Sequence, residues 1–105
     1  MQRGDVYRFK IPKGVGHEQI GVRYGVVLQA DEFLPRSVVL VAPTSTSARP
    51  ASFRPVVEVN SESMRVLAEQ LGAVDVQRLG KRVGRLSVQD LWSVDEALTT
   101  MLGLD

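Results

Sequence analysis

The sequence contains no cysteine, which excludes disulfide bonds, thiolate metal sites and a cysteine nucleophile. With a single histidine and scattered carboxylates, we expect no metal site and no other cofactor. A strong excess of one charge is also missing, because 13 basic residues face 12 acidic ones. A nucleic-acid-binding surface would therefore have to come from local clustering of basic residues.

Long apolar runs are absent as well. None approaches the roughly 20 residues that span a bilayer, and the polar start Met1–Asp5 has no secretory character. We therefore expect a soluble, cytoplasmic protein that does not bind membranes. At 105 residues the chain forms one domain, 1–105, with a modest core. A homodimer that shares apolar surface would help such a small core.

One glycine-rich loop, residues 14–23, holds most of the chemically versatile side chains. It places His17, Glu18, Gln19 and Arg23 among glycines that allow sharp turns and close approach to a ligand. The apolar run 24–28 follows and predicts a buried strand, so Arg23 should stand at the start of a rigid element. The loop is either a functional site or a polar hairpin with no function.

Alternating and β-branched runs predict a mainly β protein. The run 37–42 is continuously apolar, which is typical of a strand buried on both faces at the centre of a sheet. Residues 64–71 contain helix formers, but they are short and bracketed by a turn at 60–63 and by Gly72, which favours a strand. The predicted strands are 6–11, 23–29, 37–42, 54–59 and 64–71.

Two further segments are candidate sites. Pro43 should stop the third strand and begin a loop with four consecutive hydroxyl side chains, Thr44 to Ser47. Asp75 can cap one helical turn over 75–79. After it comes the one dense basic stretch, which is either a solvated connection or a set of phosphate contacts, and its members are Arg78, Lys81, Arg82 and Arg85.

The C-terminal segment predicts one amphipathic helix. Ser87 to Asp90 resembles a capping box, and apolar residues recur at helical spacing from Val88 to Leu102, before Gly103. Trp92 and Met101 in this stripe are better explained as core or dimer contacts than as a cofactor site.

Several motifs together resemble one known family. They are Arg3–Tyr7, Gly16–Arg23, Val41–Ser45, Leu67–Gln70 and Val74–Leu79, followed by the C-terminal helix. In this order they resemble the MazF/PemK (Kid) toxins of bacterial type II toxin-antitoxin systems, which are endoribonucleases. The resemblance implies a PemK/CcdB-like, SH3-like small barrel with a C-terminal helix, which works as a homodimer.

The resemblance also implies a reaction. The family cleaves single-stranded RNA at specific sequences without a metal, by attack of the RNA's own 2'-hydroxyl, which leaves 2',3'-cyclic phosphate and 5'-hydroxyl ends. Arg23 matches the family's central arginine, whose planar fork can bind two phosphate oxygens. Thr44 matches the family's threonine, with Ser45 as a weaker candidate beside it.

The proton acceptor has two candidates. In the Kid/PemK branch an aspartate and an arginine two residues before it were proposed as base and acid, and these positions match Glu69 and Leu67. Leu67 cannot transfer a proton, so that part does not apply here. Glu69 is either the base or an exposed strand carboxylate that pairs with an arginine. His17 has a suitable intrinsic pKa but ranks below Arg23 and Thr44.

The RNA would be held by further residues that the resemblance or their charge suggests. Tyr24 stands where the family usually has proline, and it either loosens the strand entry or offers a ring for base stacking. The expected RNA-binding set is Glu18, Gln19, Tyr24, Ser45, Gln70, Arg78, Lys81, Arg82 and Arg85.

Two other functions remain open. CcdB-like toxins share the fold but bind DNA gyrase without chemistry, through C-terminal residues that include a tryptophan. Here the one tryptophan, Trp92, lies inside the predicted helix, which weakens this alternative. The chain could also be an inactive module that binds RNA or antitoxin. For an active family member, the resemblance implies a MazE-like antitoxin as the partner.

Overall fold

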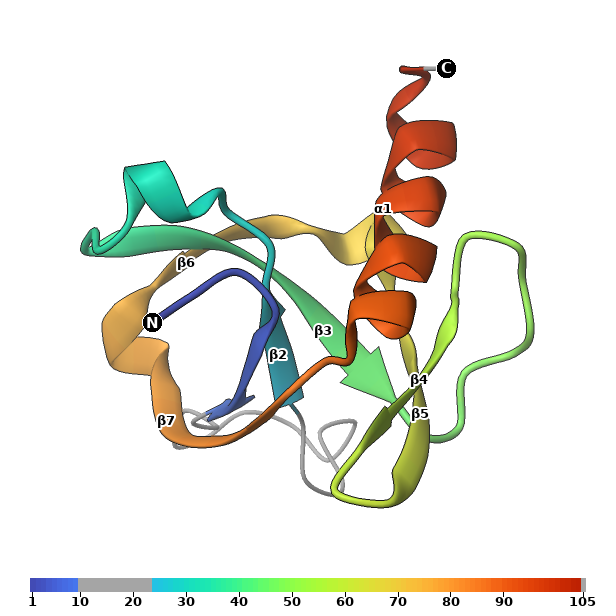
Figure 1. Ribbon diagram of the computed structural model, residues 1–105, viewed down its shortest axis with the longest axis horizontal. Coiled ribbons are helices and arrows are strands. Elements are labelled where there is room, and N and C mark those ends of the chain that lie inside the picture. Colours follow the sequence, from blue (N-terminus) through green and yellow to red (C-terminus); the bar gives the residue numbers. More distant parts are fainter. Residues whose placement is uncertain (10–23, 105) are drawn as a thin grey trace, which may run out of the picture.

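Seven strands among the described residues form one strongly bent sheet, a half-barrel that carries a single C-terminal α-helix (Figure 1). The computed structural model describes residues 1–9 and 24–104. The strand order is β4-β5-β3-β2-β1-β7, and β6 pairs with β3 beside this path. The strands are β1 (Asp5–Phe9), β2 (Tyr24–Val27), β3 (Val38–Ser45), β4 (Val56–Val59), β5 (Glu62–Val66), β6 (Gly72–Asp75) and β7 (Leu79–Arg85).

The predicted central strand is confirmed, because β3 pairs with β2, β5 and β6. Its predicted end at Pro43 is wrong, since the strand continues through Thr44 to Ser45. Pro43 is tolerated because β3 changes its pairing partner at this residue. The residues before it, Val38–Val41, pair with β6, and the residues after it, Thr44 and Ser45, pair with β5. The expectation of burial on both faces is also only partly met, because Val38 and Leu40 are exposed.

The core has two parts, one on each face of the sheet. Val26 packs under α1 with residues of β4 and β5, whereas the next residue, Val27, packs on the opposite face with β3 and β6. This is the two-residue alternation of a strand. The part of the core around Val27 requires a glycine at position 25, because a Cβ there would lie 2.6 Å from the Val41 side chain and 2.7 Å from the Phe9 ring.

The second half of the chain differs most from the prediction. The strand expected at 64–71 is β5, which begins at Glu62 and ends at Val66, and Ala68–Gln70 then form a 3₁₀ turn, η3. Strands β6 and β7 were not predicted at all. In β7, basic residues and two glycines hide the alternation, and register shifts interrupt its pairing with β1.

Local capping signals in this half are confirmed. The Asp75 side chain accepts a hydrogen bond from the Gln77 backbone N–H and starts a 3₁₀ turn, η4 (Val76–Arg78). The Ser87 side chain accepts one from the Asp90 N–H at 3.1 Å and starts α1 (Val88–Leu102). Gly103 ends the helix in the left-handed region, with φ of 69°.

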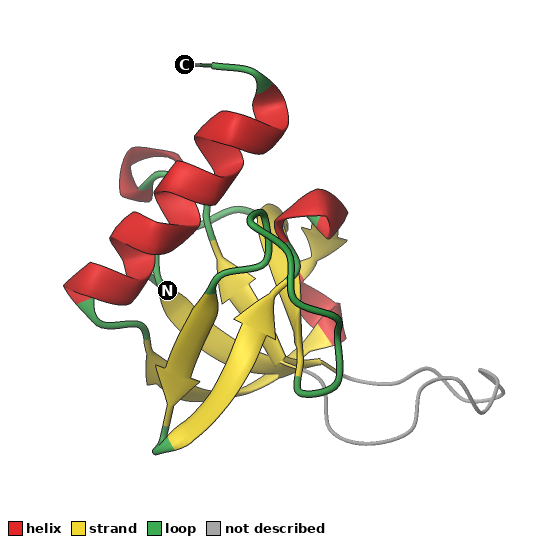
Figure 2. Cartoon of the chain, turned by 90° about the vertical axis from the view of Figure 1, so that its right-hand side faces the viewer, coloured by secondary structure: helices red, strands yellow, loops and turns green. Residues whose placement is uncertain are grey.

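Helix α1 lies across the ends of the strands (Figure 2) and covers the first part of the core. Val94 and Ala97 on the inner face of α1 are buried, and Leu91 and Leu98 are partly buried. Of the two explanations for the apolar stripe, core contact does not hold for Trp92, which is 65% exposed in the single chain. Val88, Met101 and Leu102 are exposed with it. No helix among the described residues is long and apolar enough to cross a bilayer.

Candidate functional site

The predicted hydroxyl cluster lies at the end of β3. Thr44 is 3% exposed and Ser45 7%, so both are parts of a buried strand and not of a polar loop. Thr44 pairs with Val66 of β5, and the Ser45 hydroxyl accepts a hydrogen bond from the Ser47 backbone N–H at 3.2 Å. A hydroxyl fixed in this way is held in one place before any ligand arrives.

Strand β2 supplies the neighbouring position. Its second residue, Gly25, pairs with Pro43, so the start of β2 lies beside the end of β3 that carries Thr44. The first residue, Tyr24, packs in part against the core beneath α1. Arg23 directly precedes it in the sequence. Arg23, like the predicted loop residues His17, Glu18 and Gln19, lies outside the described residues.

Glu69 is held by an arginine that the sequence did not single out. The Arg54 Nε and Nη2 atoms lie 2.8 and 2.6 Å from Glu69 Oε2, so the guanidinium makes two contacts with one carboxylate oxygen. The other oxygen, Oε1, is buried, and no hydrogen-bond donor among the described residues reaches it. Glu69 lies in η3 and not in a strand as predicted, but the expected pairing with an arginine is present.

The charge state of Glu69 follows from this contact. Burial alone would raise the pKa of the Glu69 carboxyl, but the hydrogen bond and positive charge of Arg54 outweigh it and hold this pKa below its usual value. Glu69 is therefore ionised at neutral pH. Arg54 itself is fixed further, because Nη1 donates to the Arg49 carbonyl oxygen at 3.1 Å.

The predicted basic stretch, residues 78–85, lies away from Thr44, since β2 and β1 separate β7 from β3. The Arg78 guanidinium lies 5.9 Å from the centroid of the Phe9 ring, which is a cation–π contact. Arg82 and Arg85 both contact Asp5, at 3.2 and 3.0 Å. Lys81 and Gln70, two other predicted RNA contacts, are exposed to solvent.

Asp5 is the second functional candidate that sequence reasoning missed. It is 3% exposed, and the one available signal was its place in the Arg3–Tyr7 motif. Burial would raise its pKa, but hydrogen bonds from the Gln2 backbone and the two arginines outweigh this effect and hold the pKa of Asp5 below its usual value. Burial and the nearby Asp5 charge raise the pKa of Tyr7, whose phenol therefore stays neutral at pH 7.

No group of three or more histidine, aspartate or glutamate side chains gathers within residues 1–9 and 24–104. The described site thus consists of a buried hydroxyl pair, a carboxylate bound by one arginine, and a carboxylate bound by two. Hydroxyls and arginines of this kind suit the recognition and stabilisation of a phosphate.

Comparison with known sequences decides the family. Residues 2–102 match the family of PemK-like, MazF-like toxins of type II toxin-antitoxin systems. The chain belongs to this family. A candidate toxin of Mycobacterium tuberculosis strain H37Rv is 41% identical over 97% of both chains. Endoribonuclease EndoA of Bacillus subtilis is 33% identical over 99% of this chain and 96% of its own.

Solved structures agree with this toxin family at the level of the fold. A mycobacterial endoribonuclease in complex with its cognate antitoxin superimposes with a TM-score of 0.81, over 100% of this chain and 97% of the other. The two sequences are 19% identical. The resemblance implies a PemK/CcdB-like, SH3-like small barrel with a C-terminal helix, and the half-barrel with its helix has the fold of this toxin family.

Proposed function

We propose that this protein is the endoribonuclease of a type II toxin-antitoxin pair and acts in the cytoplasm. It cleaves single-stranded RNA at specific sequences, needs no metal, and so inhibits translation and growth. A cognate MazE-like antitoxin neutralises it. The observation that carries the proposal is the buried Thr44 at the end of β3, beside the strand that follows Arg23, in a chain whose relatives are named endoribonucleases.

The proposed step is attack by the RNA's 2'-oxygen on the adjacent phosphorus. The 2'-hydroxyl gives up its proton to a base, the bond to the 5'-oxygen breaks, and that oxygen takes a proton as it leaves. The products carry a 2',3'-cyclic phosphate and a 5'-hydroxyl. Negative charge grows on the non-bridging oxygens during this step, so fixed donors lower the barrier. Arg23 supplies two such donors and Thr44 supplies one hydroxyl.

The geometry around Glu69 favours a bracing role over the role of base. One carboxylate oxygen is occupied by Arg54, and the other is buried. A depressed pKa also makes Glu69 a weak proton acceptor. His17 is the alternative in the proposed mechanism, because an imidazole with a pKa near 6.5 accepts a proton well at neutral pH.

A homodimer is part of the proposal. Several large apolar side chains are exposed in the single chain, and they include Trp92 and Leu102 on α1 and Phe33 near β3. Exposed apolar side chains of this kind are unfavourable in water, and a second copy of the chain can bury them in a dimer interface. Sedimentation or light scattering should therefore give twice the mass of the chain.

The test of the proposed function uses purified protein, single-stranded RNA and a chelator. We expect cleavage that leaves 5'-hydroxyl ends, and no inhibition of DNA gyrase in a supercoiling assay. Gyrase inhibition without RNA cleavage would instead support a CcdB-like toxin. Loss of both activities in a folded protein would support a binding module without chemistry.

A further inference from the structure

The Asp5 carboxylate organises a cluster at the junction of β1 and β7. Its Oδ2 atom accepts a hydrogen bond from the Gln2 backbone N–H at 2.8 Å. Its Oδ1 atom accepts from two arginines at once, Arg85 Nη1 at 3.0 Å and Arg82 Nη2 at 3.2 Å. Since both donors touch a single oxygen, the two guanidinium groups are held close together.

The two arginines have donors to spare. A guanidinium carries five N–H groups, and the contacts to described residues use one on Arg82 and two on Arg85, whose Nη1 also donates to Gln2 Oε1. Both side chains are partly open to solvent, 50% for Arg82 and 42% for Arg85. Within the described part of the chain, one carboxylate pairs with the two arginines, so these three side chains together carry a net positive charge.

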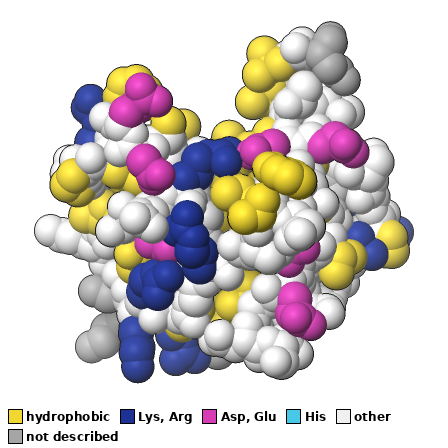
Figure 3. All heavy atoms as spheres, viewed as in Figure 1, with side chains coloured by type: hydrophobic (Ala, Val, Ile, Leu, Met, Phe, Trp, Pro, Cys, Tyr) yellow, Lys and Arg dark blue, Asp and Glu magenta, His cyan; other side chains and the backbone are white. Residues whose placement is uncertain are grey.

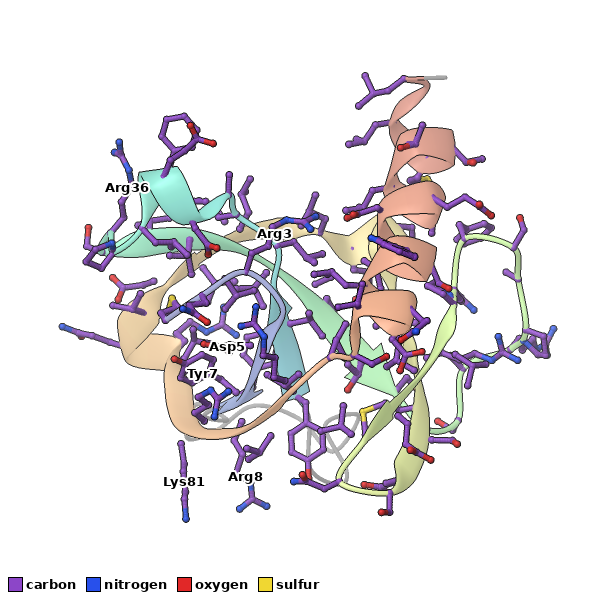
Figure 4. The ribbon with its side chains drawn as sticks, in the orientation of Figure 1. Arg3, Asp5, Tyr7, Arg8, Arg36 and Lys81 are labelled. Atoms are coloured by element: carbon purple, nitrogen blue, oxygen red, sulfur yellow. The ribbon has the colours of Figure 1, made fainter. Side chains whose placement is uncertain are left out.

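The surroundings of the cluster are basic. Within β1 and β7, which the structure describes in full, Asp5 is the one carboxylate, whereas the basic side chains also include Arg8 and Lys81. Figure 4 shows Arg8 and Lys81 at the lower edge of the view, pointing away from the sheet. In Figure 3, dark blue side chains run from the middle of this face down to that edge. An anion that approaches here meets an excess of positive charge.

We propose that Arg82 and Arg85 together bind one backbone phosphate of the RNA, and that Asp5 is the positioning residue that holds them for it. A phosphodiester has two non-bridging oxygens, which suits two guanidinium groups held side by side. Strands β1 and β2 lie between the pair and the β3 strand that carries Thr44. The pair therefore holds the RNA away from the cleaved bond. This inference rests on the proposed function.

A shared phosphate has a measurable signature. Arg82→Gln and Arg85→Gln should each weaken binding of single-stranded RNA about tenfold, and the double variant should lose little more. The slope of log affinity against log salt should fall in the double variant by about 0.7, the value for one phosphate of a single strand. Two separate phosphates would give additive losses of affinity and about twice that change in slope.

The probe is 2'-O-methylated RNA, which lacks the attacking hydroxyl and stays intact. Binding is thus measured without cleavage, so failure of this inference and failure of the proposed function remain distinguishable. Circular dichroism and melting temperature check that each variant is folded. Arg36→Gln, a change at a basic residue on another part of the surface, is the matched control and should leave the salt slope unchanged.

Asp5→Asn tests the positioning role. It removes a negative charge, so simple electrostatics predicts tighter RNA binding, whereas loss of positioning predicts several-fold weaker binding. Asp95→Asn is the control, because Asp95 pairs with a single arginine, Arg3, at 2.6 Å. We expect Asp95→Asn to leave affinity unchanged or raise it. Additive losses at Arg82 and Arg85, no loss at either, or tighter binding by folded Asp5→Asn would overturn the proposal.

Discussion

The two arginine-bound carboxylates of this protein have opposite consequences. Among residues 1–9 and 24–104, Glu69 pairs with one arginine, Arg54, so the pair is balanced in charge, and one carboxylate oxygen is buried. Asp5 faces two arginines, which remain partly exposed, so positive charge is left over at the surface. Both carboxyl groups have a lowered pKa. The difference shows that a perturbed pKa alone does not indicate a role, because the balance of partners around the group decides it.

Neither Glu69 nor Asp5 takes part in the bond-breaking step in the proposed mechanism. The largest loss of activity should therefore come from residues outside these two ion pairs. Arg23→Ala should lower the rate of RNA cleavage about 1,000-fold, and Thr44→Val about 100-fold, because each removes donors to the developing charge. Single-turnover rates on a short RNA measure this. Ser45→Ala, a change at the adjacent buried hydroxyl, is the control for Thr44 and should cost much less. Equal losses at both positions would point to packing instead.

The pH dependence of cleavage separates the candidate bases. With His17 as base, kcat/KM should fall as the pH drops below about 6.5, because the imidazole becomes protonated. With Glu69 as base, activity would persist to below about pH 4.5, since its pKa is lowered. We expect the first profile, and a loss of about 100-fold in His17→Gln at pH 7. A kcat/KM that falls only below about pH 4.5 would indicate that Glu69 is the base.

Asp5 should contribute to stability in a pH-dependent way. Its folded pKa is lowered, so its contribution is present above the unfolded pKa near 4 and is lost as the pH falls through the folded value. Asp5→Asn should lower the free energy of unfolding by about 2 kcal/mol at pH 7. The difference from the wild type should shrink below pH 4. Urea unfolding at several pH values measures this difference in stability. A difference that does not change with pH would contradict a stabilising role for the Asp5 negative charge.

Glu69→Gln should have the smallest effect on catalysis. As a brace it should lose about 1 kcal/mol of stability at neutral pH and keep cleavage within about tenfold of the wild-type rate. Arg54→Met is the matched change on the other side of the pair and should act on stability in the same direction. A Glu69→Gln variant that is as stable as the wild type but cleaves RNA more than 100-fold more slowly would contradict the bracing role of Glu69.

Much of the fold follows from local patterns in the sequence. The alternation in β1, the apolar run of β3 and the caps at Ser87 and Gly103 are local signals, and the structure confirms them. Strand β7 shows the limit of this approach. Its basic residues are accommodated because β1 brings Asp5 opposite Arg85, a contact across 80 residues that no local pattern reveals.

The candidate site divides in the same way. Thr44 was predicted through a motif, but its burial was not, because a proline before it normally ends a strand. Arg54 was not predicted, since its role depends on the fold bringing the loop before β4 against η3. Likewise, Trp92 fits a core stripe by spacing and is nevertheless exposed, because α1 rests on the sheet through Val94 and Ala97.

The central claim is that this toxin-family chain cleaves RNA by using the substrate's own 2'-hydroxyl. The most direct test maps one cleavage site in the presence of a chelator and then replaces, in the same oligonucleotide, the single 2'-hydroxyl on the 5' side of the cleaved bond with hydrogen. We predict that cleavage at that bond disappears while the oligonucleotide still binds. Continued cleavage of the deoxy-substituted bond would contradict the account.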